Sequence, residues 1–182
     1  MSDAAPCVFT IGHSSRPLDK FLGPLTESGI ECVVDVRRLP GSRSFPQYNA
    51  EALAASLSAS GIDYWHLPEL CGRRTVGELD GAAPESFWSN TSFARYAAYA
   101  RGDAFVRGLD ELLLRAARQR CILMCSEAVW WRCHRRIIAD HLIARGQHVF
   151  HIMGPGALVA ASLTHGALTK DGGVIYPRPF TE

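Results

Sequence analysis

The sequence predicts a single-domain α/β fold, a three-layer sandwich in which helices cover both faces of a mostly parallel sheet of about five strands. Three observations lead to this prediction. Short apolar runs alternate four times with longer amphipathic runs, as strands and helices do in such folds. The run at 121–125 is apolar throughout, which is typical of a strand buried on both faces. A chain of 182 residues is long enough for one well-packed core and short for two.

The first third of the chain predicts strand, helix, strand and an irregular segment. Residues 7–13 are β-branched and aromatic and end in a Gly-His-Ser turn, so we expect a strand there. Leucine and phenylalanine at three- and four-residue spacing predict a helix at 17–29, which Pro24 is expected to split or kink. A second strand follows at 30–36. Prolines and a glycine make 37–49 irregular.

The middle of the chain continues the alternation. Alanine and leucine content predicts a helix at 50–61, and an apolar run predicts a third strand at 62–67. Residues 68–90 are rich in turn formers and predict a long loop or an insertion. Residues 91–120 predict two helices with a break near Gly102.

The last third predicts two more strands around one helix. The fourth strand is expected at 121–125, a helix at 133–146 and a fifth strand at 147–153. The tail at 154–182 is rich in glycine and proline, and no element is predicted in it. No linker divides the chain, so we treat 1–182 as one domain.

Composition excludes several classes of protein. A formal net charge of +1 provides no overall attraction to DNA or acidic membranes, so any anion binding must come from local clustering. No apolar stretch reaches about 18 residues, so no membrane span is expected. The first residues lack the pattern of a secretory signal. We therefore expect the six cysteines to be reduced and the protein to be cytoplasmic.

Unusual polar sequence follows three of the predicted strands. Ligands of doubly wound sheets bind beyond the carboxyl ends of the strands, and parallel strands open at one edge. The polar segments are Gly12-His13-Ser14-Ser15-Arg16, then Asp35-Val36-Arg37-Arg38 leading to Arg43, and Cys125-Ser126-Glu127 leading to Cys133-His134-Arg135-Arg136. We expect these segments to converge on one site.

Arginines dominate the converging segments, and guanidinium groups suit phosphate and carboxylate geometry. A helix starting near Cys133 would add free N–H groups to the same edge. The alternative interpretation is that the arginines pair with Asp35, Glu127 or Asp140, or lie on solvated faces. The expected ligand-binding residues are Ser14, Asp35, Arg37, Arg43, Arg135 and Arg136.

Cys125 and Cys133 stand out among the thiols because one ends a strand and the other precedes arginines. Such surroundings favour a thiolate, which could serve as a nucleophile, a redox centre or a metal ligand. Cysteine phosphatases require C-x5-R, whereas the spacing from Cys125 to Arg132 is C-x6-R and the loop has no glycine. A cysteine phosphatase or an ordinary rhodanese is therefore not expected.

Two histidines are candidates for proton transfer in this site. His13 follows a strand and a glycine, and His134 follows Cys133. Structural hydrogen bonding is an equal alternative for His13. Glu127 is expected to orient His13 or His134, or to anchor Arg37.

Four stretches of the sequence together form a recognisable pattern: TIGHS, VVDVRRLPGSRSFPQYN, GIDYWHLPELCG and LMCSEAVWWRCHRRIIADHL. They resemble the family called domain of unknown function 488, over a core of about residues 8–153. The resemblance implies the family but no settled activity or cofactor, as the family's name states.

The combined interpretation is a protein that binds an anionic, phosphate-bearing or nucleotide-like ligand at the carboxyl edge of the sheet, with cysteine chemistry if it is an enzyme. One alternative is a non-catalytic module for nucleic-acid ends or a partner protein, since aromatic side chains accompany the arginines. The other is a metal-dependent enzyme with Cys and His ligands. No metal ligands are assigned, because there is no C-x2-C pair and neighbours on a helix, such as Cys133 and His134, diverge by about 100°.

Overall fold

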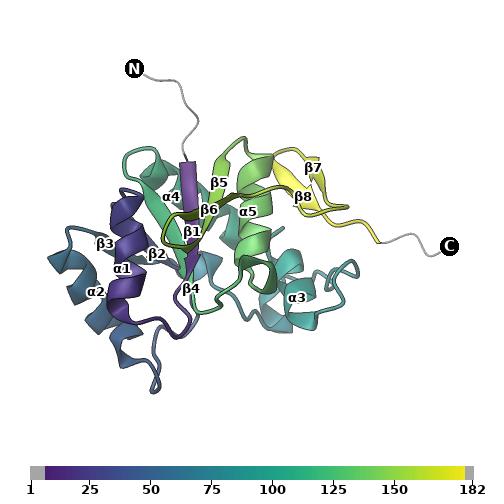
Figure 1. Cartoon of the computed structure of the whole chain (residues 1–182). Helices are drawn as coiled ribbons and strands as arrows, with labels where there is room; N and C mark the ends of the chain where they lie inside the picture. Colours follow the sequence, from purple (N-terminus) through teal and green to yellow (C-terminus); the bar gives the residue numbers. More distant parts are fainter. Residues whose placement is uncertain (1–6, 179–182) are drawn as a thin grey trace.

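The sheet at the centre of the molecule is parallel except at one edge (Figure 1). The computed structural model describes residues 7–178, and its six strands follow the order β3-β2-β4-β1-β5-β6. The parallel strands are β1 (Cys7–Gly12), β2 (Cys32–Asp35), β3 (Asp63–His66), β4 (Cys121–Cys125) and β5 (His148–Gly154). The edge strand β6 (Ala157–Ala160) is antiparallel to β5. The predicted α/β class with a mostly parallel sheet is confirmed, with one strand more than expected.

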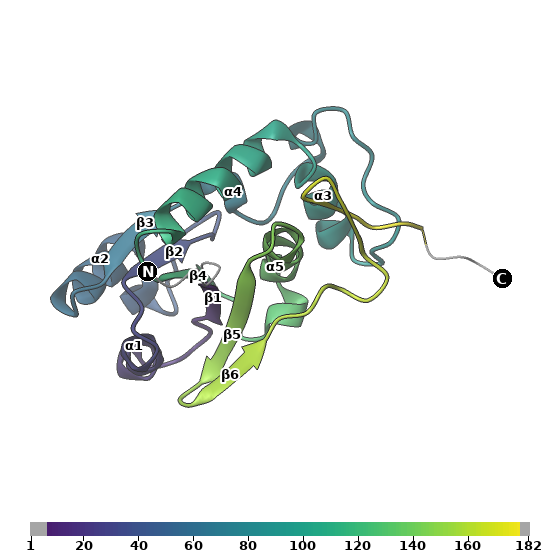
Figure 2. The same cartoon turned by 90° about the horizontal axis from the view of Figure 1, so that it is seen from above.

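Helices cover both faces of this sheet and complete the three layers (Figure 2). The helices are α1 (Leu18–Glu27), α2 (Ala50–Ala59), α3 (Thr91–Tyr99), α4 (Asp103–Ala116) and α5 (Arg135–Ala144). Short 3-10 helices lie at η1 (Pro46–Tyr48), η2 (Pro68–Leu70), η3 (Val76–Glu78) and η4 (Trp130–Arg132). Buried side chains of α1 and α2 pack in one cluster, and those of α3, α4 and α5 pack in the other.

The central strand β4 shows why its sequence is apolar throughout. Ile122 and Met124 face the cluster under α1 and α2, whereas Leu123 and Cys125 face the opposite cluster. Successive side chains of a strand point to opposite faces, so a strand covered on both sides needs apolar residues at every position.

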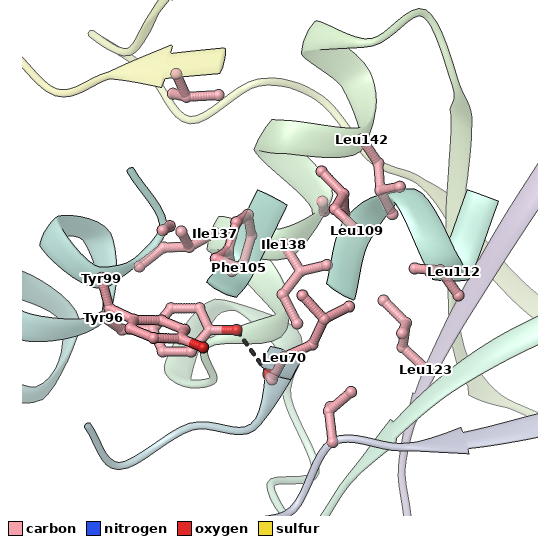
Figure 3. Packing of buried hydrophobic residues seen from close by; sticks show 14 of the residues in the cluster. Leu70, Tyr96, Tyr99, Phe105, Leu109, Leu112, Leu123, Ile137, Ile138 and Leu142 are labelled. Atoms are coloured by element: carbon pink, nitrogen blue, oxygen red, sulfur yellow. Dashed lines mark hydrogen bonds between the residues drawn. The ribbon is translucent and has the colours of Figure 1, made fainter. Parts of the chain in front are cut away.

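The larger cluster carries a polar anchor on α3 (Figure 3). The hydroxyl of Tyr96 donates a hydrogen bond of 2.6 Å to the carbonyl oxygen of Leu70, so the loop after β3 is tied to α3 within the core.

The structure corrects several details of the sequence-based prediction. Helix α1 is continuous through Pro24 and is not split. Helix α5 begins at Arg135 rather than near Cys133, because the backbone of Cys133 is extended. The tail contains β6 and a two-stranded sheet of β7 (Leu168–Lys170) and β8 (Gly173–Ile175). These strands are short and largely exposed, so no buried alternation marks them in the sequence. Of the predicted domain at 1–182, residues 1–6 and 179–182 lie outside the described part.

Helix α5 also buries a histidine that the site does not use. Burial lowers the pKa of His141 to about 4, with a smaller contribution from Arg145, and its ring lies 4.9 Å from that of Phe105. The unfolded chain therefore binds more protons than the folded protein between about pH 6.5 and pH 4. We expect His141 to remove roughly 3 kcal/mol of stability as the pH falls through this window.

Urea unfolding at several pH values measures this effect. The His141→Leu variant should lose less stability between pH 6.5 and pH 4 than the wild type, whereas the same replacement at the exposed His148 should leave the pH dependence unchanged. Parallel pH profiles for the wild type and His141→Leu would contradict the assignment.

Candidate functional site

A cavity of about 740 Å³ lies beyond the carboxyl ends of β1, β2 and β4. Because these three strands are parallel and adjacent in the order β2-β4-β1, the loops that follow them open at the same edge. The loops after β1, β2 and β4 form most of the lining, and the loop after β3 and the start of α3 close the remaining side. The convergence expected from the sequence is present in the structure.

Most of the predicted site residues contribute to this cavity. Asp35 and Arg135 are buried behind the lining and hold lining residues in place. Arg43 is exposed and lies outside the lining, and Arg136 donates instead to Thr164 Oγ1 at 2.9 Å. The predicted residues that line the cavity are His13, Ser14, Arg37, Cys125, Glu127, Cys133 and His134.

The loop after β1 reaches the site alongside the loop after β4, because the backbone pairing of the two strands continues beyond their ends. The backbone N–H of His13 donates to the carbonyl of Cys125 at 2.9 Å, and that of Ser14 donates to Ser126 at 3.0 Å. These bonds keep the two loops together past the strand ends. They require a close approach at Gly12, where a Cβ atom would overlap the carbonyl oxygen of Glu127.

His13 is held as a neutral ring with both nitrogens in use. Its Nε2 lies 3.2 Å from Arg37 Nη1, and since a guanidinium only donates, Nε2 accepts. Nδ1–H then donates to the carbonyl of Ser14 at 2.8 Å. Burial lowers the pKa of His13 to about 4, and its ring stacks on Tyr48 at 4.1 Å. This geometry favours the structural alternative for His13, because a role as general base would first require Arg37 to be displaced.

Asp35 organises the β2 loop from below the cavity. The fully buried carboxylate accepts from Arg37 Nη2 at 2.6 Å, from Arg37 Nε at 2.9 Å and from the hydroxyl of Tyr64 at 2.7 Å. Burial alone would lower the pKa of Arg37, but the hydrogen bonds and charge of Asp35 raise it. One side of the guanidinium is thus neutralised, while Nη1 remains directed to His13.

Cys125, Cys133 and His134 form a compact cluster at the β4 end of the cavity. Their two Sγ atoms and a ring nitrogen of His134 all lie within 4.8 Å of one another, and Cys133 Sγ is 3.6 Å from His134 Nδ1. The divergence expected for helical neighbours does not occur, because Cys133 is extended (φ −130°, ψ 148°) and only His134 has helical dihedral angles. Among residues 7–178, this is the only group of three or more His, Cys, Asp or Glu side chains whose ligand atoms lie close enough to hold one metal ion.

The two thiols differ in acidity, contrary to the expectation that both sites favour a thiolate. A hydrogen bond with Cys133 together with burial raises the pKa of Cys125 to about 12. Burial also raises the pKa of Cys133, but the hydrogen bond from Cys125 and the charge of Arg135 lower it to about 6. Arg135 Nε donates to Cys133 Sγ at 3.3 Å, so the negative charge of the pair belongs to Cys133.

Glu127 does not have any of the roles expected for it. Its side chain is exposed at the cavity rim, and at 7–178 its carboxylate has no hydrogen bond or ion pair to His13, His134 or Arg37. Only its backbone carbonyl takes part, as the acceptor of a 2.5 Å hydrogen bond from Arg135 Nη2.

Several residues that support the site were not among the predicted site residues, and the sequence suggested Tyr48, Tyr64 and Phe93 only as aromatic side chains that could stack on bases. Tyr48 and Tyr64 contact His13 and Asp35, and Gly72 leaves room for the ring of His134. Arg73 and Phe93 line the cavity from segments interpreted only as a loop and a helix. The sequence around the two tyrosines does not indicate the contacts that they make in the site. The glycine in LCG, next to a turn, was a weak indication of a close approach.

The fold and the cavity define a class: a doubly wound α/β protein with a cysteine- and arginine-lined pocket at the carboxyl edge of its sheet. The chain belongs to the DUF488 family, whose model, described as "Domain of unknown function DUF488", matches residues 17–142. The resemblance seen in the sequence is therefore confirmed. A search of curated proteins and a search of solved structures return no match. Among the described residues, no helix is both long and apolar enough to span a membrane.

Proposed function

We propose that the cavity binds a small phosphate-bearing anion of nucleotide size. The observation that carries the proposal is the charge of the lining. Four guanidinium groups face the cavity and a single carboxylate, Glu127, accompanies them, although the whole chain has a formal net charge of only +1. The arginines are Arg37, Arg38, Arg73 and Arg132.

Two of these arginines are available to a ligand. Arg37 is paired with Asp35, and Arg38 is paired with Glu78 at 2.8 Å. Arg73 and Arg132 are exposed, and within 7–178 neither has an ion pair with a carboxylate. Guanidinium groups bind phosphate through charge-assisted and often bidentate hydrogen bonds.

The rest of the lining suits a ligand with an organic part. Phe45 and Phe93 supply aromatic surface, on which a base or another flat ring can stack. A volume of about 740 Å³ falls in the usual range of small-molecule sites. Hydroxyl groups that can donate to phosphate oxygens come from Ser14, Ser15, Ser42, Ser92 and Ser126.

A small ligand is favoured over a nucleic-acid duplex because the excess positive charge lies inside a cavity. Duplex binding depends on many phosphate contacts spread over a basic surface. A net charge near zero provides no such surface for the protein as a whole.

Calorimetric titration with AMP, adenosine and inorganic phosphate tests the proposal. AMP should bind more tightly than adenosine, and raising the salt concentration should weaken AMP binding. Arg132→Ala and Arg73→Ala should each weaken AMP binding by about tenfold or more, since a hydrogen bond to a charged group contributes about 1.5 kcal/mol or more.

Arg43→Ala is the matched control, because Arg43 is an exposed arginine outside the cavity lining. It should leave AMP affinity unchanged. Equal affinities for adenosine and AMP, or equal losses in the Arg43 and Arg132 variants, would show that the cavity is not a phosphate site.

A further inference from the structure

We propose that Cys125, Cys133 and His134 bind one thiophilic divalent metal ion, best matched by Zn²⁺, with a coordination position open to the cavity. This inference goes beyond anion binding and does not depend on it, since it uses none of the four lining arginines. It rests on the spacing of the three ligand atoms, the orientation of the imidazole and the way the chain shapes the space around them.

The spacing of the ligand atoms fits a tetrahedral ion. With Zn–S bonds of about 2.3 Å and Zn–N bonds of about 2.0–2.1 Å, neighbouring ligand atoms lie about 3.5–3.8 Å apart. Cys133 Sγ and His134 Nδ1 are 3.6 Å apart, and no pair in the cluster exceeds 4.8 Å. Side-chain rotations that move the ligand atoms by a few tenths of an ångström to about 1 Å are therefore enough to bring all three to bonding distance of one ion.

The imidazole presents the correct nitrogen. His134 Nε2 is 3.1 Å from the carbonyl oxygen of Val36, and because a carbonyl only accepts, Nε2 carries the hydrogen. The lone pair of Nδ1 then faces the two sulfurs. Histidine ligands of metals are characteristically fixed in this way, by a hydrogen bond from the other ring nitrogen to a carbonyl or carboxylate.

The surroundings hold the ligands without filling the metal position. A Cβ atom at Gly72 would come within 2.6 Å of His134 Nδ1, so the glycine keeps this nitrogen unobstructed. Tyr96 packs edge-on against the imidazole with ring centroids 4.9 Å apart. Arg135, which does not line the cavity, donates to Cys133 Sγ as a supporting group.

The site is buried but reachable. Cys125 is 6% exposed and Cys133 is 2% exposed, yet both sulfur-bearing residues and His134 line the cavity. Three protein ligands with a fourth position open to a cavity is the arrangement of catalytic rather than structural zinc sites. Two thiolates and an imidazole favour Zn²⁺ or Co²⁺ over Mg²⁺ and Ca²⁺, which prefer oxygen ligands.

Titration of the reduced, metal-free full-length protein with Co²⁺ tests the site directly. One equivalent should bind, with thiolate-to-cobalt charge-transfer absorption and the visible bands of a tetrahedral ion, and Zn²⁺ should displace it. Cys133→Ser and Cys125→Ser should each remove the charge-transfer intensity of one sulfur and weaken binding by roughly a hundredfold or more.

Cys121→Ser is the matched control, because Cys121 is a fully buried thiol on the same strand, at the end remote from the cavity. It should bind Co²⁺ as the wild type does. Gly72→Ala keeps all three ligands but places a methyl group against Nδ1, so it should weaken binding by roughly ten- to a hundredfold.

A measurement on the wild type covers the case in which a variant does not fold. One equivalent of Zn²⁺ should protect Cys125 and Cys133 from alkylation, while the half-buried Cys7 stays reactive. Absent or non-stoichiometric Co²⁺ binding, a cobalt spectrum without thiolate charge transfer, or protection of neither cysteine would each overturn the metal site. The AMP titration can be carried out on the same metal-free protein, so a failure here is separate from a failure of the anion site.

Discussion

Asp35→Ala should lower the free energy of unfolding by about 3–5 kcal/mol, the loss expected when one partner of a buried ion pair is removed. Asp35 is fully buried and the side chain of Arg37 is 5% exposed, so water cannot replace the lost carboxylate. The hydroxyl of Tyr64 and the backbone N–H of Arg37 lose their acceptor as well. Urea or guanidinium unfolding with linear extrapolation measures the change.

A double variant separates the cost of leaving the Arg37 guanidinium buried without a partner from the cost of lost packing. In Asp35→Ala/Arg37→Met the uncompensated guanidinium is absent, so the double variant should be more stable than Asp35→Ala alone. If the second replacement adds a further loss instead, Arg37 is not the source of the cost and the ion pair does not organise the β2 loop.

Gly12→Ala should destabilise the protein by about 3 kcal/mol or more, at the upper end of overpacking effects. The added Cβ would overlap the carbonyl oxygen of Glu127 and lie 2.9 Å from Arg135 Nη2. A backbone carbonyl cannot rotate away as a side chain does. Relief requires the loops after β1 and β4 to separate, which breaks the hydrogen bonds from His13 to Cys125 and from Ser14 to Ser126.

Gly77→Ala gives the matched control for this prediction. Gly77 lies in the exposed η3, its φ is not positive, and a Cβ there meets no atom within 4 Å. Alanine should therefore leave stability unchanged or raise it by up to about 1 kcal/mol, because it restricts the unfolded chain. If the two replacements change the free energy of unfolding equally, the close approach at Gly12 is not the reason why this position requires glycine.

These two positions connect the fold to the site. Gly12 allows the β1 and β4 loops to meet, and Asp35 fixes the β2 loop against them through Arg37 and His13. The four lining arginines and the Cys125–Cys133–His134 cluster therefore line one cavity rather than separate surfaces. A Zn²⁺ ion held by two thiolates would leave the cluster with no net charge, so it would cancel the thiolate charge next to the space proposed for an anion.

The sequence predicts the fold well because its signals are local. The apolar run at 121–125 identifies a strand buried on both faces, the run at 30–36 identifies a second strand, and three- and four-residue spacing identifies α1. Short exposed strands such as β6 are not predicted in this way. Their pairing with the edge of a sheet depends on the neighbouring strand and not on a hydrophobic pattern in their own sequence.

The candidate site is predicted only in outline. Parallel strands bring polar loops to one edge whatever their side chains do, so the positions of His13, Arg37 and Cys125 follow from topology. Arg43 and Arg136 show the limit, since one points to solvent and the other pairs with Thr164. The side chains of adjacent loop residues point in different directions, which depend on the backbone dihedral angles. The spacing of residues in the sequence does not specify these angles.

The sequence by itself thus determined the order of the elements, the family and the edge at which chemistry-bearing residues gather, because these depend on periodicity and chain direction. Only the tertiary structure decided that the pKa of Cys133 is lowered while that of Cys125 is raised, that Asp35 neutralises Arg37, and that His134 brings Nδ1 to 3.6 Å from Cys133 Sγ. The physical reason is that charge, tautomer and acidity depend on burial and on distances of a few ångströms between groups far apart along the chain.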